Sequence, residues 1–144
     1  MGGGGLREVW VGSGPRAQES HDDGTVRRVG PVVTEGQRVL DTVRTLREHG
    51  PRAIGSRQVA SHGSMRDDCE ISVPELDLAV ATAMEHGAVG ARMTGGGFGG
   101  AAIALVDQEA RQTIADAVAA AFAAAGYREP TVFTVHAAQG ARRD

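Results

Sequence analysis

The sequence has one cysteine, Cys69, among its 144 residues. A single cysteine cannot build an internal disulfide framework or a cysteine-based zinc site, so we expect a reducing, cytoplasmic setting. Aromatic residues make up only 3% of the chain, so Ala, Val, Leu and Ile have to fill most of a core. No apolar run reaches membrane-spanning length, and the first residues lack the regions of a secretory signal. We therefore expect no membrane partner.

The sequence also has no excess of basic residues: 15 Lys and Arg stand against 18 Asp and Glu, and the formal net charge is −3. No basic patch interleaved with aromatic residues is present, which argues against a general nucleic-acid-binding protein. The length suits one domain with a modest core of its own. These observations favour a single small domain.

Glycine is the residue in excess, with 21 copies, about twice the usual share. The glycines gather in two places, at the N-terminus and between Ala91 and Gly100. Residues 1–31 have turn and linker chemistry without a sustained period, so we expect a poorly ordered linker or the remnant of a longer segment. Residues 139–144 are expected to form a tail.

Apolar periodicity predicts four helices. They run from Thr34 to about His49, from about Arg52 to Met65, from Ser72 to about Gly87, and from Asp107 to Ala125. The second is only weakly amphipathic, and the other three have an apolar face: Val39, Leu40, Val43 and Leu46 in the first; Leu76, Val80, Ala83, Met84 and Gly87 in the third; Ala110, Ile114, Val118 and Phe122 in the fourth. Thr34 with Gln37, and Ser72 with Glu75, have the spacing of capping boxes. Asp107 is expected to cap the last helix, and Gly126 stands where a C′ glycine belongs.

Three strands are predicted, at Val89–Met93, Ala101–Val106 and Thr131–Ala137. The second is apolar throughout, as expected for a strand covered on both faces. The element order predicts the α+β class, with helices packed on one face of an antiparallel sheet. Three strands leave two open edges, which indicates a missing strand or a missing partner.

The segment "TGGGFGG", from Thr94 to Gly100, raises the possibility of a phosphate-binding loop. Gly95, Gly97 and Gly100 fit a dinucleotide-binding fingerprint with Asp116 as the ribose-binding acid, but that fingerprint needs a helix directly after the loop, and a strand follows here. The P-loop pattern fails because no Lys-Ser/Thr pair follows the glycines. The protein-kinase glycine loop fails because its partner motifs are missing.

Three stretches together resemble the galactokinases of the GHMP kinase family. "GARMTGGGFGGAAIALV" (Gly90–Val106) resembles the third signature motif of that family. "ASHGSMRDDCEISVPELD" (Ala60–Asp77) and "VVTEGQRVLD" (Val32–Asp41) are similar to galactokinase segments upstream of it, in the same order.

The resemblance implies a two-domain kinase with its active site in the cleft between the domains. The sugar-binding motif, the loop that wraps ATP and Mg²⁺, and the catalytic aspartate of the family belong to the N-terminal domain and are not found here. Residues 32–138 then correspond to the ferredoxin-like C-terminal domain, lacking a strand, and residues 1–31 to the remnant of the domain crossover. No catalytic residue and no metal ligand is expected in this chain.

The resemblance also assigns roles to residues of the glycine segment. They form a wall beside the phosphates of ATP, with Phe98 packed as an anchor: Thr94, Gly95, Gly96, Gly97, Phe98, Gly99 and Gly100. Arg92 either supplies charge or forms a structural ion pair. A tight hairpin without a ligand is the alternative for the glycines.

The second stretch carries Ser61, His62, Arg66, Asp67 and Asp68. Neighbouring serine and histidine side chains rarely have the geometry of a nucleophile and its base, and two adjacent acids without a third ligand make a weak metal site. We expect these residues to build a turn and the surface that meets the N-terminal domain.

The resemblance implies the C-terminal part of an ATP-dependent galactokinase, which converts galactose and ATP to galactose 1-phosphate and ADP with Mg²⁺. A separate N-terminal kinase domain is the expected partner, and the chain alone is expected to be inactive. The alternatives are a non-catalytic, galactokinase-like regulatory module and a degenerate gene fragment.

Overall fold

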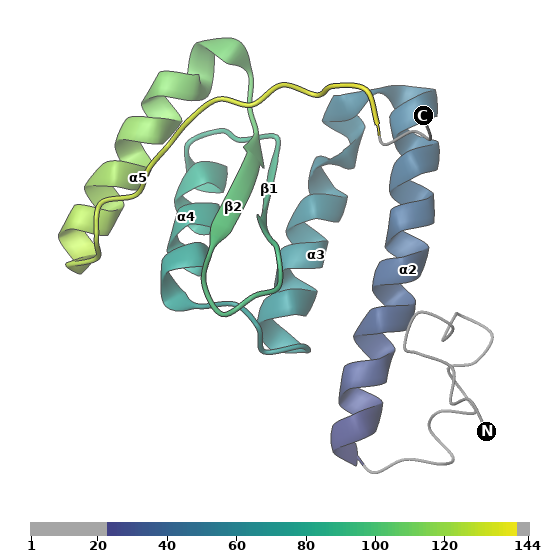
Figure 1. Cartoon of the computed structure of the whole chain (residues 1–144). Helices are drawn as coiled ribbons and strands as arrows, with labels where there is room; N and C mark the ends of the chain where they lie inside the picture. The colour runs from purple at the N-terminus through teal and green to yellow at the C-terminus, as the bar shows by residue number, and fades with distance from the viewer. Residues whose placement is uncertain (1–22, 141–144) are drawn as a thin grey trace.

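The computed structural model describes residues 23–140, with side chains described from residue 30. Its elements are α2 (Asp23–His49), η3 (Pro51–Ile54), α3 (Gly55–Asp67), α4 (Pro74–Glu85), β1 (Gly90–Thr94), β2 (Ala101–Leu105), η4 (Gln108–Ala110) and α5 (Arg111–Ala125). Figure 1 shows α3 and α4 beside the β1–β2 hairpin, with α2 and α5 at opposite ends of the molecule. The predicted α+β class is confirmed.

Helix α2 starts earlier than predicted, at Asp23 instead of Thr34, and continues through Pro31. Thr34 forms no capping box, because its hydroxyl donates to the carbonyl oxygen of Pro31 at 3.1 Å. Proline lacks an N–H group but is compatible with helical φ, so the helix can pass through it at some cost. The predicted boundary between the linker (residues 1–31) and the domain (residues 32–138) therefore falls inside α2. The prediction of poor order for residues 1–22 lies outside the described residues.

Two other predicted caps are wrong, and one is confirmed. The hydroxyl of Ser72 donates to Asp77 Oδ1 at 2.6 Å, and Pro74 opens α4 after Val73. Asp107 caps no helix with its side chain and instead forms an ion pair with Arg52. Gly126 ends α5 in the left-handed conformation at φ 72°, as predicted for a C′ glycine.

The sheet has two antiparallel strands among the described residues, with Gly90 opposite Leu105 and Thr94 opposite Ala101. The predicted third strand at Thr131–Ala137 is wrong. Its side chains are all exposed, and Thr134 Oγ1 accepts a hydrogen bond from Arg111 at 3.4 Å. Residues of high β-propensity favour a strand only where one face of the strand is buried. Both faces of this segment are exposed, so its composition alone does not make it a strand.

Strand β1 is buried, whereas β2 is exposed. Ala91 and Met93 have no exposed surface, but the alternate residues Ala101 and Ile103 of β2 are both exposed. The prediction that β2 is covered on both faces is therefore wrong. An apolar run fits an exposed edge strand as well as a buried one, because periodicity alone does not report on coverage.

The core lies between α4, α5 and β1. Its members are small or aliphatic except for one ring: Val80, Ala83, Ala88, Ala91, Ile114, Val118 and Phe122. The spacing of four between Ile114, Val118 and Phe122 confirms the predicted face of α5. Phe122 also packs edge to face on Tyr127, with ring centroids 5.7 Å apart.

Helix α3 packs on β1 through a contact between backbones. A Cβ atom on Gly55 would overlap the carbonyl oxygen of Val89, and one on Gly90 would lie 2.6 Å from Gly55 Cα. Glycine at both positions therefore allows α3 to approach the start of β1 more closely than any other residue would.

Helix α2 exposes its predicted apolar stripe instead of burying it. The stripe consists of Val39, Leu40, Val43 and Leu46, all of which are exposed. Between residues 23 and 140, no helix is both long enough and apolar enough to cross a membrane.

Candidate functional site

The glycine hairpin, residues 95–100, joins β1 to β2. Gly95, Gly97, Gly99 and Gly100 have φ between 89° and 117°. Residues with a Cβ atom rarely adopt these angles, which explains the concentration of glycine in this turn. The hairpin is followed by a strand, which agrees with the rejection of the dinucleotide fingerprint.

The segment between α3 and α4 holds the hairpin at its tip. The amide of Phe98 donates to the carbonyl oxygen of Ile71 at 2.7 Å. A Cβ atom on Gly97 would lie 2.7 Å from both Ile71 Cβ and Ile71 O, so the backbone of the hairpin rests directly on Ile71. The glycine hairpin is therefore held at its tip by Ile71 and at its two ends by β1 and β2.

Phe98 does not pack as an anchor, which corrects the prediction. Its side chain is 76% exposed, and its φ of 61° is unusual for a residue other than glycine. The backbone amide of Phe98, and not its ring, makes the anchoring contact.

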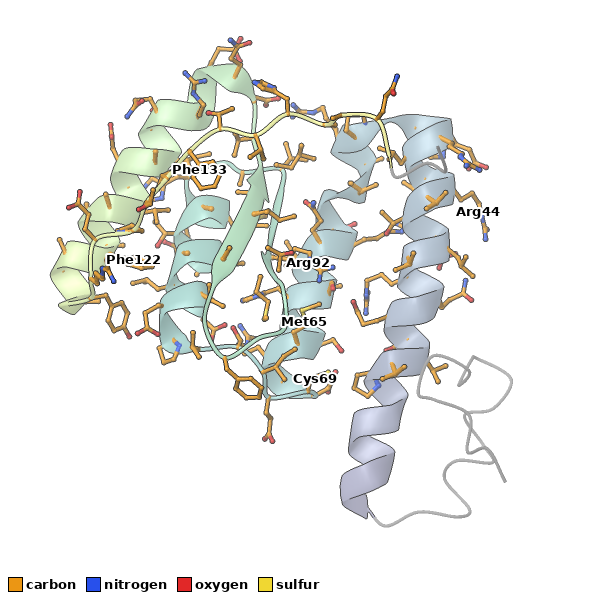
Figure 2. All side chains as sticks on the ribbon, in the orientation of Figure 1. Arg44, Met65, Cys69, Arg92, Phe122 and Phe133 are labelled. Carbon is orange, nitrogen blue, oxygen red and sulfur yellow. The ribbon has the colours of Figure 1, made fainter. Side chains whose placement is uncertain are left out.

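Arg92 makes no ion pair with any residue that the structure describes. Its Nε donates to the carbonyl oxygen of Met93 at 2.9 Å, and its Nη2 lies 3.5 Å from the sulfur of Met65. Figure 2 shows Arg92 and Met65 in the space between β1 and α3. The guanidinium charge is therefore not neutralised by a described carboxylate.

Ser61 and His62 lie in the middle of α3, and not in a turn or on the surface as predicted. Their exposed fractions are 1% and 3%. Ser61 donates a hydrogen bond to Glu35 of α2, and Glu35 also accepts from Arg38 Nε at 2.6 Å. Because Ser61 contacts α2 and not His62, the pair cannot act as a nucleophile with its base.

His62 connects three elements. Its Nδ1 accepts the amide hydrogen of Met93 in β1 at 3.2 Å, and its Nε2 lies 3.0 Å from Asp77 Oδ1 in α4. With Nδ1 as acceptor, the proton of the neutral ring is on Nε2. This buried nitrogen lies close to the carboxylate of Asp77 but makes no hydrogen bond of ordinary geometry, so the contact is electrostatic. Burial lowers the pKa of His62, although Asp77 acts in the opposite direction. The imidazole is therefore neutral at pH 7.

Arg66 and Asp67 are the last residues of α3, and only Asp68 lies in the turn that was predicted for all three. Arg66 pairs with Asp67 through two bonds of 2.7 and 2.8 Å, and this hydrogen bonding lowers the pKa of Asp67. Asp68 accepts from the hydroxyl of Ser64 at 2.9 Å. A role in contacting another domain stays a prediction for these residues.

Cys69 follows that turn and is half-buried. Burial raises the pKa of its thiol, and Asp68 and Glu35 raise it further. A protonated thiol is a poor nucleophile, so this cysteine is not suited to covalent catalysis.

Sequence reasoning did not single out Asp77 or Ile71, and it assigned Ser72 only to a capping box. All three lie in the stretch Ala60–Asp77 that carries the family resemblance, and that stretch was the available signal. Their roles depend on contacts between α3, α4 and the hairpin, which spacing along the chain does not reveal.

Comparison with known proteins places these features in a family. Residues 42–124 match the family model described as GHMP kinases C terminal. Galactokinases from Streptomyces coelicolor, Mycobacterium tuberculosis and Haemophilus influenzae are 53%, 49% and 40% identical over 85%, 80% and 81% of this chain. Those matches cover 31–32% of the relatives, so the chain spans about a third of their length.

Solved structures agree with this assignment. Lactococcus lactis galactokinase complexed with galactose superposes with a TM-score of 0.74 at 31% identity, covering 88% of this chain and 34% of that one. A mevalonate kinase from L. major shares the fold, with a TM-score of 0.55 at 24% identity over 85% of this chain and 35% of that one. The resemblance predicted from the sequence is confirmed, and the chain belongs to the GHMP kinase family, with the C-terminal domain of that family as its matched part.

Proposed function

We propose that this chain supplies the C-terminal domain of an ATP-dependent galactokinase, in which the glycine hairpin forms one wall of the phosphate site. The observation that carries the proposal is the identity of 40–53% to galactokinases over at least 80% of the chain. The reaction would transfer the γ-phosphoryl group of ATP to galactose.

The chemistry of the hairpin supports this role. Catalysis of phosphoryl transfer consists mainly of positioning and charge stabilisation. Backbone N–H groups in a turn without Cβ atoms can face phosphate oxygens without steric interference. The hairpin meets this requirement at Gly95, Gly96, Gly97, Gly99 and Gly100, and Arg92 adds a cationic group at the base.

Mg²⁺ has no ligand set in the described part of the chain. Between residues 30 and 140, no three side chains of His, Cys, Asp or Glu gather closely enough to hold a metal ion. We therefore assign the Mg²⁺ ligands and the base that accepts the sugar proton to an N-terminal domain. The match covers 32% of the Streptomyces coelicolor relative, so the rest of that protein is long enough to contain such a domain.

Calorimetric titration with ATP tests the hairpin's role. We expect weak binding to the chain alone, in the millimolar range or weaker, and tighter binding once the chain is paired with the N-terminal part of the Streptomyces coelicolor galactokinase. Gly97→Ala, which would place a Cβ atom against Ile71, should weaken ATP binding in the pair, whereas Gly63→Ala on α3 has open space and should not. Equal ATP affinity for both variants would contradict the proposed wall.

A further inference from the structure

The inference concerns the residues that hold the glycine hairpin in place. Two contacts fix the hairpin: the amide of Met93 at its base donates to His62 Nδ1, and the amide of Phe98 at its tip donates to Ile71 O. The two acceptors belong to different elements, α3 and the segment before α4. The hairpin keeps its position only if these two elements keep theirs.

Two contacts join α3 to this segment: the amide of Ile71 donates to the carbonyl oxygen of Met65 at 3.0 Å, and one carboxylate oxygen bridges side chains of both. Asp77 Oδ1 lies 3.0 Å from His62 Nε2 and accepts the hydroxyl of Ser72 at 2.6 Å. Ser72 directly follows Ile71 in the chain, so Asp77 fixes both the histidine at the base of the hairpin and the segment at its tip.

We propose that His62, Asp77 and Ser72 form a positioning network that holds the glycine hairpin in its phosphate-facing conformation. That the hairpin faces a phosphate rests on the proposed function. The existence of the network and its effect on the hairpin do not depend on it. His62, Asp77 and Ser72 are positioning residues, since none of them belongs to the hairpin itself.

Burial makes the network sensitive to the loss of one member. His62 is 3% exposed, and Met93 has no exposed surface. A buried donor without an acceptor loses more stability than an exposed one, because water cannot replace the missing partner. Around His62, the charged groups are Asp77 on α4, Arg92 on β1, and Arg66 and Asp67 on α3.

Amide hydrogen exchange of the full chain, followed by NMR, tests the network. In Asp77→Ala we expect exchange at Met93 and Phe98 to accelerate about tenfold, the size of effect that follows when the acceptors of both amides lose a polar contact that holds them in place. Asp77→Asn keeps an acceptor oxygen and should stay close to the unsubstituted chain. The matched control is Asp116→Ala on α5, whose carboxylate is exposed and bonded only to Gln112 among the described residues.

Two further measurements keep the test decisive if Asp77→Ala does not fold. Ser72→Ala should accelerate exchange at Phe98 more than at Met93, since the lost hydrogen bond lies next to Ile71, the acceptor of Phe98, and leaves the contact between Asp77 and His62 in place. The imidazole nitrogens of His62 in the unsubstituted chain should show an unprotonated Nδ1 and a protonated Nε2 near pH 7.

These results separate the network from the proposed function. The inference is overturned by unchanged exchange in a folded Asp77→Ala chain, by equal acceleration in Asp77→Asn and Asp77→Ala, or by a His62 protonated at Nδ1. None of these readouts involves ATP or galactose. In a catalytically active pair, Asp77→Ala should raise the KM for ATP and Asp77→Asn should not; a pair without activity but with the expected exchange rates would contradict the galactokinase proposal alone.

Discussion

Gly55 and Gly90 are the residues at which α3 and β1 come closest. Because a Cβ atom on Gly55 would overlap the backbone of Val89, Gly55→Ala must displace α3 from the strand. We expect a loss of about 1–3 kcal/mol in the free energy of unfolding, the usual cost of overpacking. Gly63→Ala in the same helix meets open space and should be neutral or stabilising by about 0.5–1 kcal/mol. Urea unfolding of both variants measures the difference, and equal stabilities would contradict the close packing.

His62 makes stability depend on pH. Burial lowers its pKa in the folded chain below the ordinary value of 6.5, so the unfolded chain binds the proton more readily. The contribution of neutral His62 to the free energy of unfolding is complete above about pH 6.5, the ordinary pKa of histidine. It is lost as the pH falls through the lowered pKa of His62 in the folded chain. In His62→Gln the free energy of unfolding should be lower at pH 7.5 than in the unsubstituted chain, and it should change less between pH 5 and 7. His49→Gln, at an exposed position on α2, should retain the slope of the unsubstituted chain, and a slope unaffected by His62→Gln would contradict this assignment.

At the scale of the elements, the described chain beyond Pro130 lies at the surface. Residues 131–140 are exposed throughout and belong to no strand. Among the described residues, a chain that ends at Pro130 loses exposed positions, with contacts such as the hydrogen bond from Arg111 to Thr134. We expect its free energy of unfolding to stay within about 0.5 kcal/mol of the full chain, as for surface changes in general. A much larger loss in thermal unfolding would show that the segment has a structural role.

Periodicity predicted the elements whose apolar faces are buried against each other. The spacing of Val80 with Ala83, and of Ile114 with Phe122, identified the core faces of α4 and α5, and the glycines identified the hairpin. Predictions failed where a residue had another partner available. Ser72 bonds to Asp77 instead of capping α4, and Asp107 pairs with Arg52.

The candidate site was predictable only in part, for the same physical reason. Family resemblance located the hairpin and the stretch Ala60–Asp77, but the roles of residues in that stretch depend on three-dimensional contacts. His62 was expected at a surface and is buried, and Phe98 was expected to be buried and is exposed. Sequence spacing does not show which side chains meet across elements.

At the scale of the whole molecule, the exposed stripe of α2 favours association. Val39, Leu40, Val43 and Leu46 present apolar side chains along one helix, and large exposed apolar patches mark contact surfaces. We expect the chain to self-associate at micromolar concentration when no other domain is present. Leu40→Glu, at a position that is 62% exposed, should shift the sedimentation equilibrium toward monomer without lowering the thermal midpoint. Gln37→Glu adds the same charge on the same helix outside the stripe and should change the equilibrium less.

The central claim is that this chain is one half of a phosphoryl-transfer site, and galactose-dependent release of ADP tests it most directly. The assay compares the purified chain, the N-terminal part of the Streptomyces coelicolor galactokinase, and the two together, each with ATP, Mg²⁺ and galactose. Positioning and metal charge provide most of the rate in phosphoryl transfer, and one hairpin cannot replace them. We predict turnover by the pair and none by either part alone. Turnover of galactose by the chain alone, or no turnover by a pair that forms a stable complex, would contradict the account.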